Sequence, residues 1–568
     1  MNELVLQGLP AAGGIAVGRA LVFRDPPPPR EGPGGPDEQK RALVALARVA
    51  AELGYAAKRL RARGLADEAE ILEACALIAQ DPDLREAAVE TAETTSAEAS
   101  VTVAAERHAA LLEALPDPLL AARAADVREI GRRAVAILAG RSFPTGEGDV
   151  VLVARELGAS ELTELRLGQS QIVGVALAAG AITSHAAIMA RALGLPMVVS
   201  TGDDLLSLAE GEVVVDGGSG RIVVAPDPAT RRSATVAIEH RAGRRTALAQ
   251  MRGLPSVTTD GVPVRLLGNA STAGEVASSL EAGAEGVGLL RTELAFLQAG
   301  RWPTEEQHAA ALTPALARLE GRLATVRTFD FGSDKTPPFL AGDERRGLDL
   351  ALAFPDELLA QLRAIVRAGA RAQLRVLLPL VESGEQVRAA RALLALAAAE
   401  APYPALGAMI ETPEAARRAA EIAREADFLS IGTNDLVQYT LGLDRELPVA
   451  STLAAADPEV LRHVAAVAAA GQRAGLPVEV CGEAAGEPPL AALFVGLGVG
   501  ELSVSPARLD EIRAVVRSLD AATAASVAQD ALSAANATEA LELATGLVSG
   551  EAHDDAGEMV GGLGGAVA

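Results

Sequence analysis

Lysine is almost missing from this chain. Only Lys40, Lys58 and Lys335 are present, so arginine supplies nearly all of the positive charge. Acidic residues outnumber basic ones and the formal net charge is −24 at pH 7. Such a charge argues against a nucleic-acid partner and favours a protein partner with a basic surface. It also makes a lysine inside a motif more noticeable than usual.

Cysteine and targeting signals are scarce as well. Cys75 and Cys481 lie far apart, which indicates no disulfide framework and agrees with a reducing compartment. Residues 1–3 lack the basic start of a secretory signal. The uncharged stretch 167–190 is long enough to span a membrane, but glycines and polar side chains interrupt it. We therefore expect a cytoplasmic protein without direct membrane insertion.

After Pro255 short apolar runs alternate with helical segments, and this is the strongest architectural signal in the sequence. Eight strand-helix alternations predict a (β/α)8 TIM barrel. The predicted strands are Val264–Leu267, Gly286–Leu290, Ala324–Phe329, Leu374–Leu380, Gly407–Ile410, Phe428–Ile431, Val478–Val480 and Leu502–Val504.

Polar residues lie at or near the C-terminal ends of these predicted strands. They are Asn269, Arg291, Arg327, Asp330, Glu411, Asn434, Asp435, Cys481 and Ser505. Any one of them is as readily explained as a solvated loop residue. Barrels of this kind place their sites at the C-terminal strand ends, however, so together the residues predict a site for a phosphate-type ligand and a metal ion.

The first half of the chain has another pattern. Residues 1–23 and 145–226 carry short apolar runs with glycine turns, which predict strands. The residues between them, 24–144, are rich in alanine with the apolar spacing of helices. We expect a linker helix at 227–254 and a flexible Gly- and Ala-rich tail at 546–568.

One histidine in this half lies where an anion would be stabilised. Val173–Leu177 predicts a buried strand, Gly180–Ser184 a turn and Ala186–Leu195 a helix, so His185 falls at a helix N-terminus. Unpaired backbone N–H groups and the helix dipole favour a phosphoryl group on the imidazole there. A Thr-Ser-His tripeptide alone is more often a histidine satisfied by a backbone carbonyl. The rest of the sequence has to decide between the two.

The segment Gly180–Arg191 closely resembles the phosphohistidine motif shared by Enzyme I of the phosphoenolpyruvate:sugar phosphotransferase system, pyruvate phosphate dikinase and phosphoenolpyruvate synthase. Other segments resemble further elements of this family: Val287–Glu293, Arg327–Lys335, Met409–Pro413, Ile431–Thr440 with Asp444 and Arg445, and Val480–Glu483. The likeness is to Enzyme I in particular. The other two enzymes need a large ATP-binding domain, for which the first 150 residues leave no room.

The resemblance implies a multidomain α/β protein. Residues 1–23 and 145–226 would form a swivelling phosphohistidine domain, 24–144 a helical insert that docks the phosphocarrier protein HPr, and 255–545 a TIM barrel that binds phosphoenolpyruvate. A homodimer through the barrel is implied as well. Asp67, Glu68, Glu70 and Glu73 would give the insert an acidic face for a basic partner, although a charge run is more often a solvated helix surface.

The resemblance also implies a reaction. Neutral His185 would take the phosphoryl group of phosphoenolpyruvate and pass it to HPr, the first step of sugar uptake, while Cys481 protonates the leaving enolate. One Mg²⁺ would lie on the hard carboxylate oxygens of Glu411 and Asp435. The implied substrate-binding residues are Arg291, Arg327, Lys335, Asn434, Asp435 and Arg445, whose guanidinium groups suit phosphate and carboxylate.

Several positions depart from the family pattern. Ala181 replaces a glycine of the histidine motif, and Leu162 stands where the family has a threonine, with Thr163 one place later. Ser333 replaces a glycine and Asp349 a phosphate-facing arginine, for which Arg345 or Arg346 would have to compensate. These departures leave a second interpretation open: a catalytically weakened paralogue that binds phosphoenolpyruvate or HPr in a regulatory role.

Overall fold

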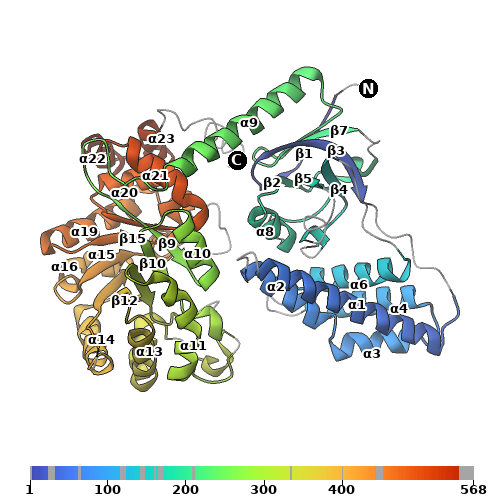
Figure 1. Ribbon diagram of the computed structural model, residues 1–568, viewed down its shortest axis with the longest axis horizontal. Helices are drawn as coiled ribbons and strands as arrows, with labels where there is room; N and C mark the ends of the chain where they lie inside the picture. Colours follow the sequence, from blue (N-terminus) through green and yellow to red (C-terminus); the bar gives the residue numbers. More distant parts are fainter. Residues whose placement is uncertain are drawn as a thin grey trace. The chain divides into compact units, whose positions relative to one another are not determined.

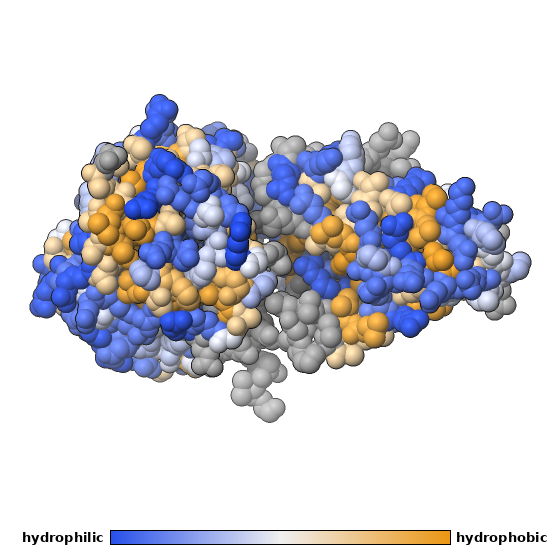
Figure 2. Space-filling view, turned by 90° about the horizontal axis from the view of Figure 1, so that it is seen from below, coloured by the Kyte–Doolittle hydropathy of each residue, from blue (hydrophilic) through white to orange (hydrophobic). Residues whose placement is uncertain are grey.

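The structure is a computed structural model of the chain, and it divides into two compact units, Met1–Arg244 and Arg245–Ala568 (Figure 1). It describes residues 3–548 except 24–31, 62–65, 115–122, 141–147, 159–160, 164–170, 183, 208–210, 298, 333–335, 344, 400 and 443–451. Within these residues, every helix is too short or too polar to cross a bilayer. On the face seen in Figure 2, apolar patches are separated by hydrophilic side chains.

The first unit contains a mixed eight-stranded sheet in the order β1-β8-β7-β3-β4-β5-β6-β2. Its strands are β1 (Leu4–Gln7), β2 (Leu9–Ala12), β3 (Ile15–Phe23), β4 (Asp149–Ala154), β5 (Gln171–Leu177), β6 (Met197–Val199), β7 (Glu212–Asp216) and β8 (Arg221–Val224). Side chains alternate between its two faces. Leu152 of β4 packs in a core shared with helices, whereas Val151 and Val153 pack on the other face.

Helices fill the interval between β3 and β4, as the sequence predicts, and they lie side by side in Figure 1. They are α1 (Pro36–Arg61), α2 (Ala66–Ile78), α3 (Pro82–Thr91), α4 (Ala97–Glu113) and α6 (Ala124–Leu138); α8 (His185–Ala192) follows β5, and α9 (Pro228–Gln250) contains the unit boundary. Small residues let α4 and α6 approach closely, since a Cβ at Gly131 would collide with Ala105. Of the proposed acidic face, only the Glu73 side chain lies within the described residues, and it pairs with Arg61.

The second unit is a closed barrel of eight parallel strands, which confirms the predicted fold. The strands are β9 (Arg265–Ala270), β10 (Gly286–Leu290), β11 (Leu323–Arg327), β12 (Gln373–Leu378), β13 (Ala405–Ile410), β14 (Phe428–Ile431), β15 (Val478–Val480) and β16 (Glu501–Val504). Two strands end earlier than predicted. Phe329 leaves the β11 direction to pack against Trp302, and Leu380 has a positive φ that breaks the extended conformation of β12.

Helices surround the barrel strands (Figure 1). They are α10 (Ala273–Glu281), α11 (Glu305–Leu316), α12 (Gly347–Ala353), α13 (Pro355–Ala368), α14 (Gly384–Ala397), α15 (Pro413–Arg417), α16 (Ala419–Ile422), α17 (Thr433–Leu441), α19 (Pro458–Ala474), α20 (Pro488–Gly496), α21 (Leu509–Ser518), α22 (Ala521–Ala531) and α23 (Ala537–Val548). The last helix continues past Gly546, where the sequence places the start of the tail, because its apolar face is buried as far as Val548.

Candidate active site

His185 is the first residue of α8, directly after the turn that follows β5. The helix begins here because Ser184 is its N-cap, whose hydroxyl accepts a hydrogen bond from the Ala187 N–H at 3.2 Å. In this turn the positive φ falls on Gly180 and not on Ala181. The alanine that replaces a family glycine therefore causes no backbone strain at that position.

The His185 imidazole is held by a carboxylate from another part of the chain. Its Nδ1 lies 2.9 Å from Oδ1 of Asp126 on α6, whose side chain is buried and also pairs with Arg123 at 3.2 Å. A carboxylate accepts hydrogen bonds, so Nδ1 carries the proton and the lone pair of Nε2 is available to a nucleophilic reaction. The sequence analysis missed this residue. Its only signal is an acidic side chain among the buried positions of α6.

Leu162 contributes no polar group to this histidine. Its side chain is fully buried in the apolar core that the sheet shares with the helices. The neighbouring Glu161 accepts a hydrogen bond from the Gly158 N–H at 2.9 Å. Orientation of the imidazole thus comes from Asp126 and not from position 162.

In the second unit, the predicted site residues meet at the C-terminal ends of the barrel strands. Arg291 follows β10, Arg327 ends β11, Glu411 follows β13, Asn434 and Asp435 lie in the first turn of α17 after β14, and Cys481 follows β15. Backbone hydrogen bonds join these strand ends, with Cys481 N bonded to Ile431 O at 3.1 Å. Lys335 and Arg445 lie outside the described residues.

Arg327 is a buried cation at this rim. Its guanidinium pairs with Glu293 at 2.7 Å and with Asp330 at 3.1 Å. Burial lowers the pKa of Arg327, but the carboxylates of Glu293, Asp330 and Glu411 outweigh it, and the pKa is raised. Among the described residues its buried Nε has no hydrogen-bond partner. A buried donor of this kind is an unsatisfied position that a ligand oxygen would fill.

Glu411 and Asp435 form a pair of oxygen donors on neighbouring strand ends. Glu411 is 2% exposed, and its carboxylate lies directly against Gly432, because a Cβ at that glycine would collide with Oε1. Asn434 is fixed by the Glu483 N–H, which donates to its Oδ1 at 3.1 Å. The described residues hold no cluster of three or more His, Cys, Asp or Glu side chains suited to a metal. Two carboxylates fit Mg²⁺, which keeps waters and shares substrate oxygens.

Cys481 is a buried thiol at the same rim. Burial raises the pKa of Cys481 to about 12. The Ser430 hydroxyl donates to its sulfur at 3.3 Å. The side chain is therefore a thiol at neutral pH and has a proton to give.

Asp349 lies in a rim groove that Arg345, Arg346 and Tyr439 also line. Its carboxylate accepts a hydrogen bond from Gln386 at 2.6 Å, so a neighbouring side chain already binds it. Arg345 pairs with Asp343 at 2.7 Å. Arg346 instead donates to the Tyr439 hydroxyl at 2.8 Å and lies 3.9 Å from Asp435, which makes it a cation beside one member of the candidate metal pair.

Three segments of the chain are similar to domains of one known protein family. Residues 7–123, 146–220 and 245–521 match the PEP-utilising enzyme family in its N-terminal, mobile and PEP-binding domains, in that order. A phosphoenolpyruvate-protein phosphotransferase from Streptomyces coelicolor is 39% identical over 576 residues, which cover 97% of this chain and 100% of that protein. The chain belongs to the PEP-utilising enzyme family.

Two further relatives define the extent of the similarity. A phosphoenolpyruvate-protein phosphotransferase from a Bacillus species is 32% identical over 95% of this chain and 97% of that protein. A multiphosphoryl transfer protein from Rhodobacter capsulatus is 39% identical over 76% of this chain, but the chain spans only about half of its length, 53%. The resemblance to Enzyme I found in the sequence is thus confirmed at the level of the family.

Proposed function

We propose that the chain is a phosphoenolpyruvate-protein phosphotransferase: it transfers the phosphoryl group of phosphoenolpyruvate to Nε2 of His185 and then to a histidine of HPr, releasing pyruvate. This would be the first step of sugar uptake by the phosphotransferase system. The observation that carries the proposal is the 2.9 Å contact between His185 Nδ1 and Asp126, which leaves Nε2 of a residue at a helix N-terminus as the acceptor atom.

In the first step Nε2 of His185 attacks phosphorus, the N–P bond forms and the bond to the enol oxygen breaks. Positive charge develops on the imidazole, and the Asp126 carboxylate at Nδ1 stabilises it. The transferred group then lies at the start of α8, where free backbone N–H groups and the helix dipole favour an anion. Positioning and electrostatic stabilisation account for most of the catalysis in such transfers.

The barrel rim would hold phosphoenolpyruvate. Arg327 and Arg291 provide forked donors for its phosphate and carboxylate, and Asn434 and Asp435 line the same rim. Lys335 and Arg445 belong to the proposed set through the resemblance. The enolate that leaves is protonated at carbon by Cys481, whose buried thiol carries the proton.

Mg²⁺ is the proposed metal, with Glu411 and Asp435 as the residues that would hold it. When bound it would neutralise charge on the phosphate and orient the substrate. Arg346, which lies 3.9 Å from Asp435, adds a permanent positive charge on the same side of the rim. In this proposal Arg346 supplies the charge that Asp349 does not.

The partners follow from the same proposal. One imidazole has to meet both phosphoenolpyruvate and HPr, so the phosphohistidine domain must swivel between them, a hinged motion. The net charge of −24 suits a carrier with a basic docking surface. A homodimer through the barrel remains part of the proposal.

A second candidate is a weakened paralogue that binds phosphoenolpyruvate or HPr without efficient turnover. The observation that favours it is Leu162, which lies in the core and offers the imidazole no hydroxyl group. This candidate requires binding of phosphoenolpyruvate without appearance of a phosphoprotein.

Labelled phosphoenolpyruvate separates the two candidates. With Mg²⁺ we expect the intact protein to acquire an acid-labile, base-stable label. His185→Ala should abolish the label, and the control His463→Ala, a half-buried histidine in α19, should keep it. An intact protein that acquires no label would contradict the transferase proposal and support the paralogue.

A further inference from the structure

Two carboxyl groups lie next to each other inside the barrel. Glu479 is the middle residue of β15 and Glu501 is the first residue of β16, and the parallel register pairs the two positions. Paired positions on neighbouring strands are roughly 5 Å apart and point to the same side of the sheet. Glu479 is 0% exposed and Glu501 5% exposed, so neither carboxyl is screened by bulk water.

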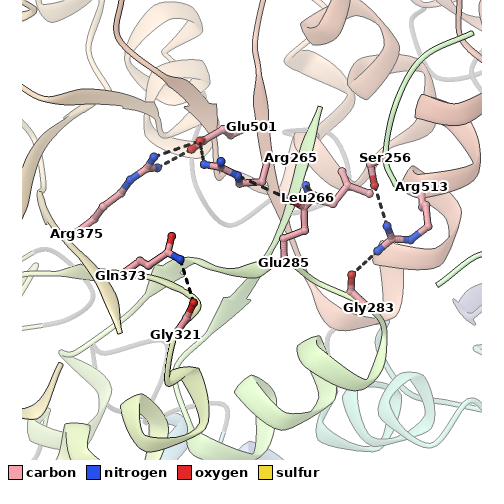
Figure 3. Close-up of polar contacts among 10 residues, drawn as sticks. All are labelled: Ser256, Arg265, Leu266, Gly283, Glu285, Gly321, Gln373, Arg375, Glu501 and Arg513. Carbon is pink, nitrogen blue, oxygen red and sulfur yellow. Dashed lines mark hydrogen bonds and ion pairs between the residues drawn. The ribbon is translucent and has the colours of Figure 1, made fainter. Parts of the chain in front are cut away.

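The two acids differ in their partners. Glu501 is bound by two arginines, Arg265 at 2.6 Å and Arg375 at 2.7 Å, and Figure 3 shows both guanidinium groups pointing at its carboxylate. Glu479 has no such partner: within the described part of the chain neither of its carboxyl oxygens makes a hydrogen bond. The pair therefore consists of one neutralised carboxylate and one unpartnered carboxyl group.

The Glu479 carboxyl lies against β10 and β16. A Cβ at Gly288 would collide both with its Oε1 and with the Ser503 hydroxyl, so the space exists only because residue 288 is a glycine. Burial raises the pKa of Glu479 well above its usual range, and the neighbouring Glu501 carboxylate raises it further. Arg375 and Arg265 act in the opposite direction. The group is therefore a neutral carboxylic acid that retains its proton inside the barrel.

This acid lies one layer below the thiol at the rim. Cys481 follows Glu479 by two positions, which places both on the same face of the chain. Ser430 on β14 pairs in register with Glu479, and its hydroxyl donates to the Cys481 sulfur at 3.3 Å. A hydroxyl that touches the thiol thus neighbours the acid.

We propose that Glu479 is the internal proton source that restores the Cys481 thiol after each release of pyruvate, with the Ser430 hydroxyl as the relay. The proposal rests on the function proposed above. Cys481 loses its S–H proton to the substrate carbon and becomes a thiolate. The Ser430 proton then moves to sulfur. The Glu479 carboxyl, which makes no hydrogen bond among the described residues, turns to the serine oxygen and gives it the O–H proton. Glu479 is left as a carboxylate, which regains a proton from water before the next turnover.

The groups that face Glu479 agree with this direction of transfer. Arg265 on β9 and Arg375 on β12 are near enough to stabilise the transient carboxylate, while Glu501 on β16 favours its reprotonation. The thiolate that forms on Cys481 is buried, and burial raises the pKa of this thiol to about 12, so the thiolate readily takes up a proton.

Two isotope exchanges on one sample test the proposal. The full chain is incubated with Mg²⁺, phosphoenolpyruvate and carbon-labelled pyruvate in D₂O. Exchange of labelled carbon into phosphoenolpyruvate requires only the proton that moves back and forth between Cys481 and pyruvate. Entry of deuterium into the pyruvate methyl group requires, in addition, that the Cys481 thiolate takes up a deuteron from the solvent. We expect Glu479→Gln to keep carbon exchange and to lower deuterium entry per carbon exchange at least tenfold.

Ser430→Ala should lower the same ratio, and the control Thr325→Val, a buried barrel residue outside the proposed relay, should leave it unchanged. An unchanged ratio in Glu479→Gln, or loss of both exchanges together, would overturn the proposal. Absence of carbon exchange in the unmodified chain would contradict the proposed function instead.

Infrared spectroscopy provides a second measurement. We expect the unmodified chain to show a protonated carboxyl band that Glu479→Gln removes, and absence of this band from the unmodified chain also overturns the proposal.

Discussion

The two units organise their reactive groups in different ways. In the first, a single histidine is held by one carboxylate that reaches it from a distant helix, 59 positions away in the chain. In the second, Arg291, Arg327, Glu411, Asp435 and Cys481 each follow or end a different strand of the same barrel. The chemistry of the first unit therefore depends on one contact, whereas that of the second is distributed over the rim.

The difference has a physical origin. A closed parallel barrel brings all of its C-terminal strand ends to one rim, so every strand contributes a position without further folding. A helix start offers N–H groups to an anion but does not fix the tautomer of a histidine. That second task requires a side chain from elsewhere, here Asp126. Substitutions should accordingly have steeper effects in the first unit than in the second.

Asp126→Asn should give the largest effect among substitutions that leave the reacting groups in place. An amide in place of the carboxylate no longer requires a proton on Nδ1, and the favoured tautomer and the charge stabilisation are lost. We expect the rate of His185 labelling by phosphoenolpyruvate to fall roughly 10³- to 10⁴-fold, as for a triad aspartate. Quench-flow measurement with the exposed Asp83→Asn as control checks it, and an effect under tenfold would remove Asp126 from the proposed mechanism.

Cys481→Ala should come next. The substitution removes the proton donor but leaves the phosphate-binding groups of the rim, so pyruvate formation should fall about 10²-fold, the lower range for a general acid. Binding of phosphoenolpyruvate, measured by calorimetry, should change little. Cys75→Ala is the matched control, because this second buried cysteine lies in the helical insert of the other unit. Equal rates for both variants would count against Cys481 as the donor.

Glu411→Gln should weaken the binding of Mg²⁺. Loss of one of the two carboxylates should raise the Mg²⁺ concentration for half-maximal labelling by about 10- to 100-fold, while excess Mg²⁺ restores part of the rate. Chelation of Mg²⁺ should stop labelling of the unmodified chain. The control is Glu414→Gln, an exposed acid three positions further on that pairs with Arg417. An unchanged Mg²⁺ titration for Glu411→Gln would exclude Glu411 as a ligand.

Glu479→Gln should change stability and not the phosphoryl step. The pKa of Glu479 is raised in the folded barrel, mainly by burial, so above the unfolded pKa of about 4.3 the folded state binds more protons than the unfolded state. Stability then falls as pH rises through the window between the two pKa values. Compared with the unmodified chain, the variant should gain in urea midpoint as the pH rises above the unfolded pKa of about 4.3.

The control for that experiment is Glu382→Gln, since Glu382 is exposed. The urea midpoint of this control should equal that of the unmodified chain at every pH. If the urea midpoint of Glu479→Gln changes with pH in the same way as that of the unmodified chain, Glu479 is ionised in the folded barrel.

Much of the barrel could be predicted from the sequence because its signals are local. Each strand is a short apolar run, and each rim residue follows its own run, so Arg327, Glu411 and Cys481 were found without knowledge of any contact. Strand ends were less accurate, since the end of β11 depends on how Phe329 packs against Trp302. The roles of the rim residues stay predictions, as do those of Lys335 and Arg445 outside the described residues.

Two residues could not be predicted from the sequence, because their importance lies in contacts between distant segments. In the sequence, Asp126 is one of several charged residues on an alanine-rich helix. Its role is visible only from the contact between Asp126 on α6 and His185 on α8. In the sequence, Glu479 is a charged residue in the middle of a short apolar strand. Only the strand register shows that it neighbours Glu501 and Ser430. Periodicity predicts which face a residue occupies, but it does not predict which side chain comes to meet it.

The central claim is that phosphoenolpyruvate phosphorylates His185 on Nε2. Phosphorus NMR of the full chain, incubated with phosphoenolpyruvate and Mg²⁺, distinguishes the two ring nitrogens and detects the bond itself. The account predicts a single phosphohistidine signal of the Nε2 type that His185→Ala abolishes. A signal of the Nδ1 type would contradict it, because Asp126 occupies that nitrogen.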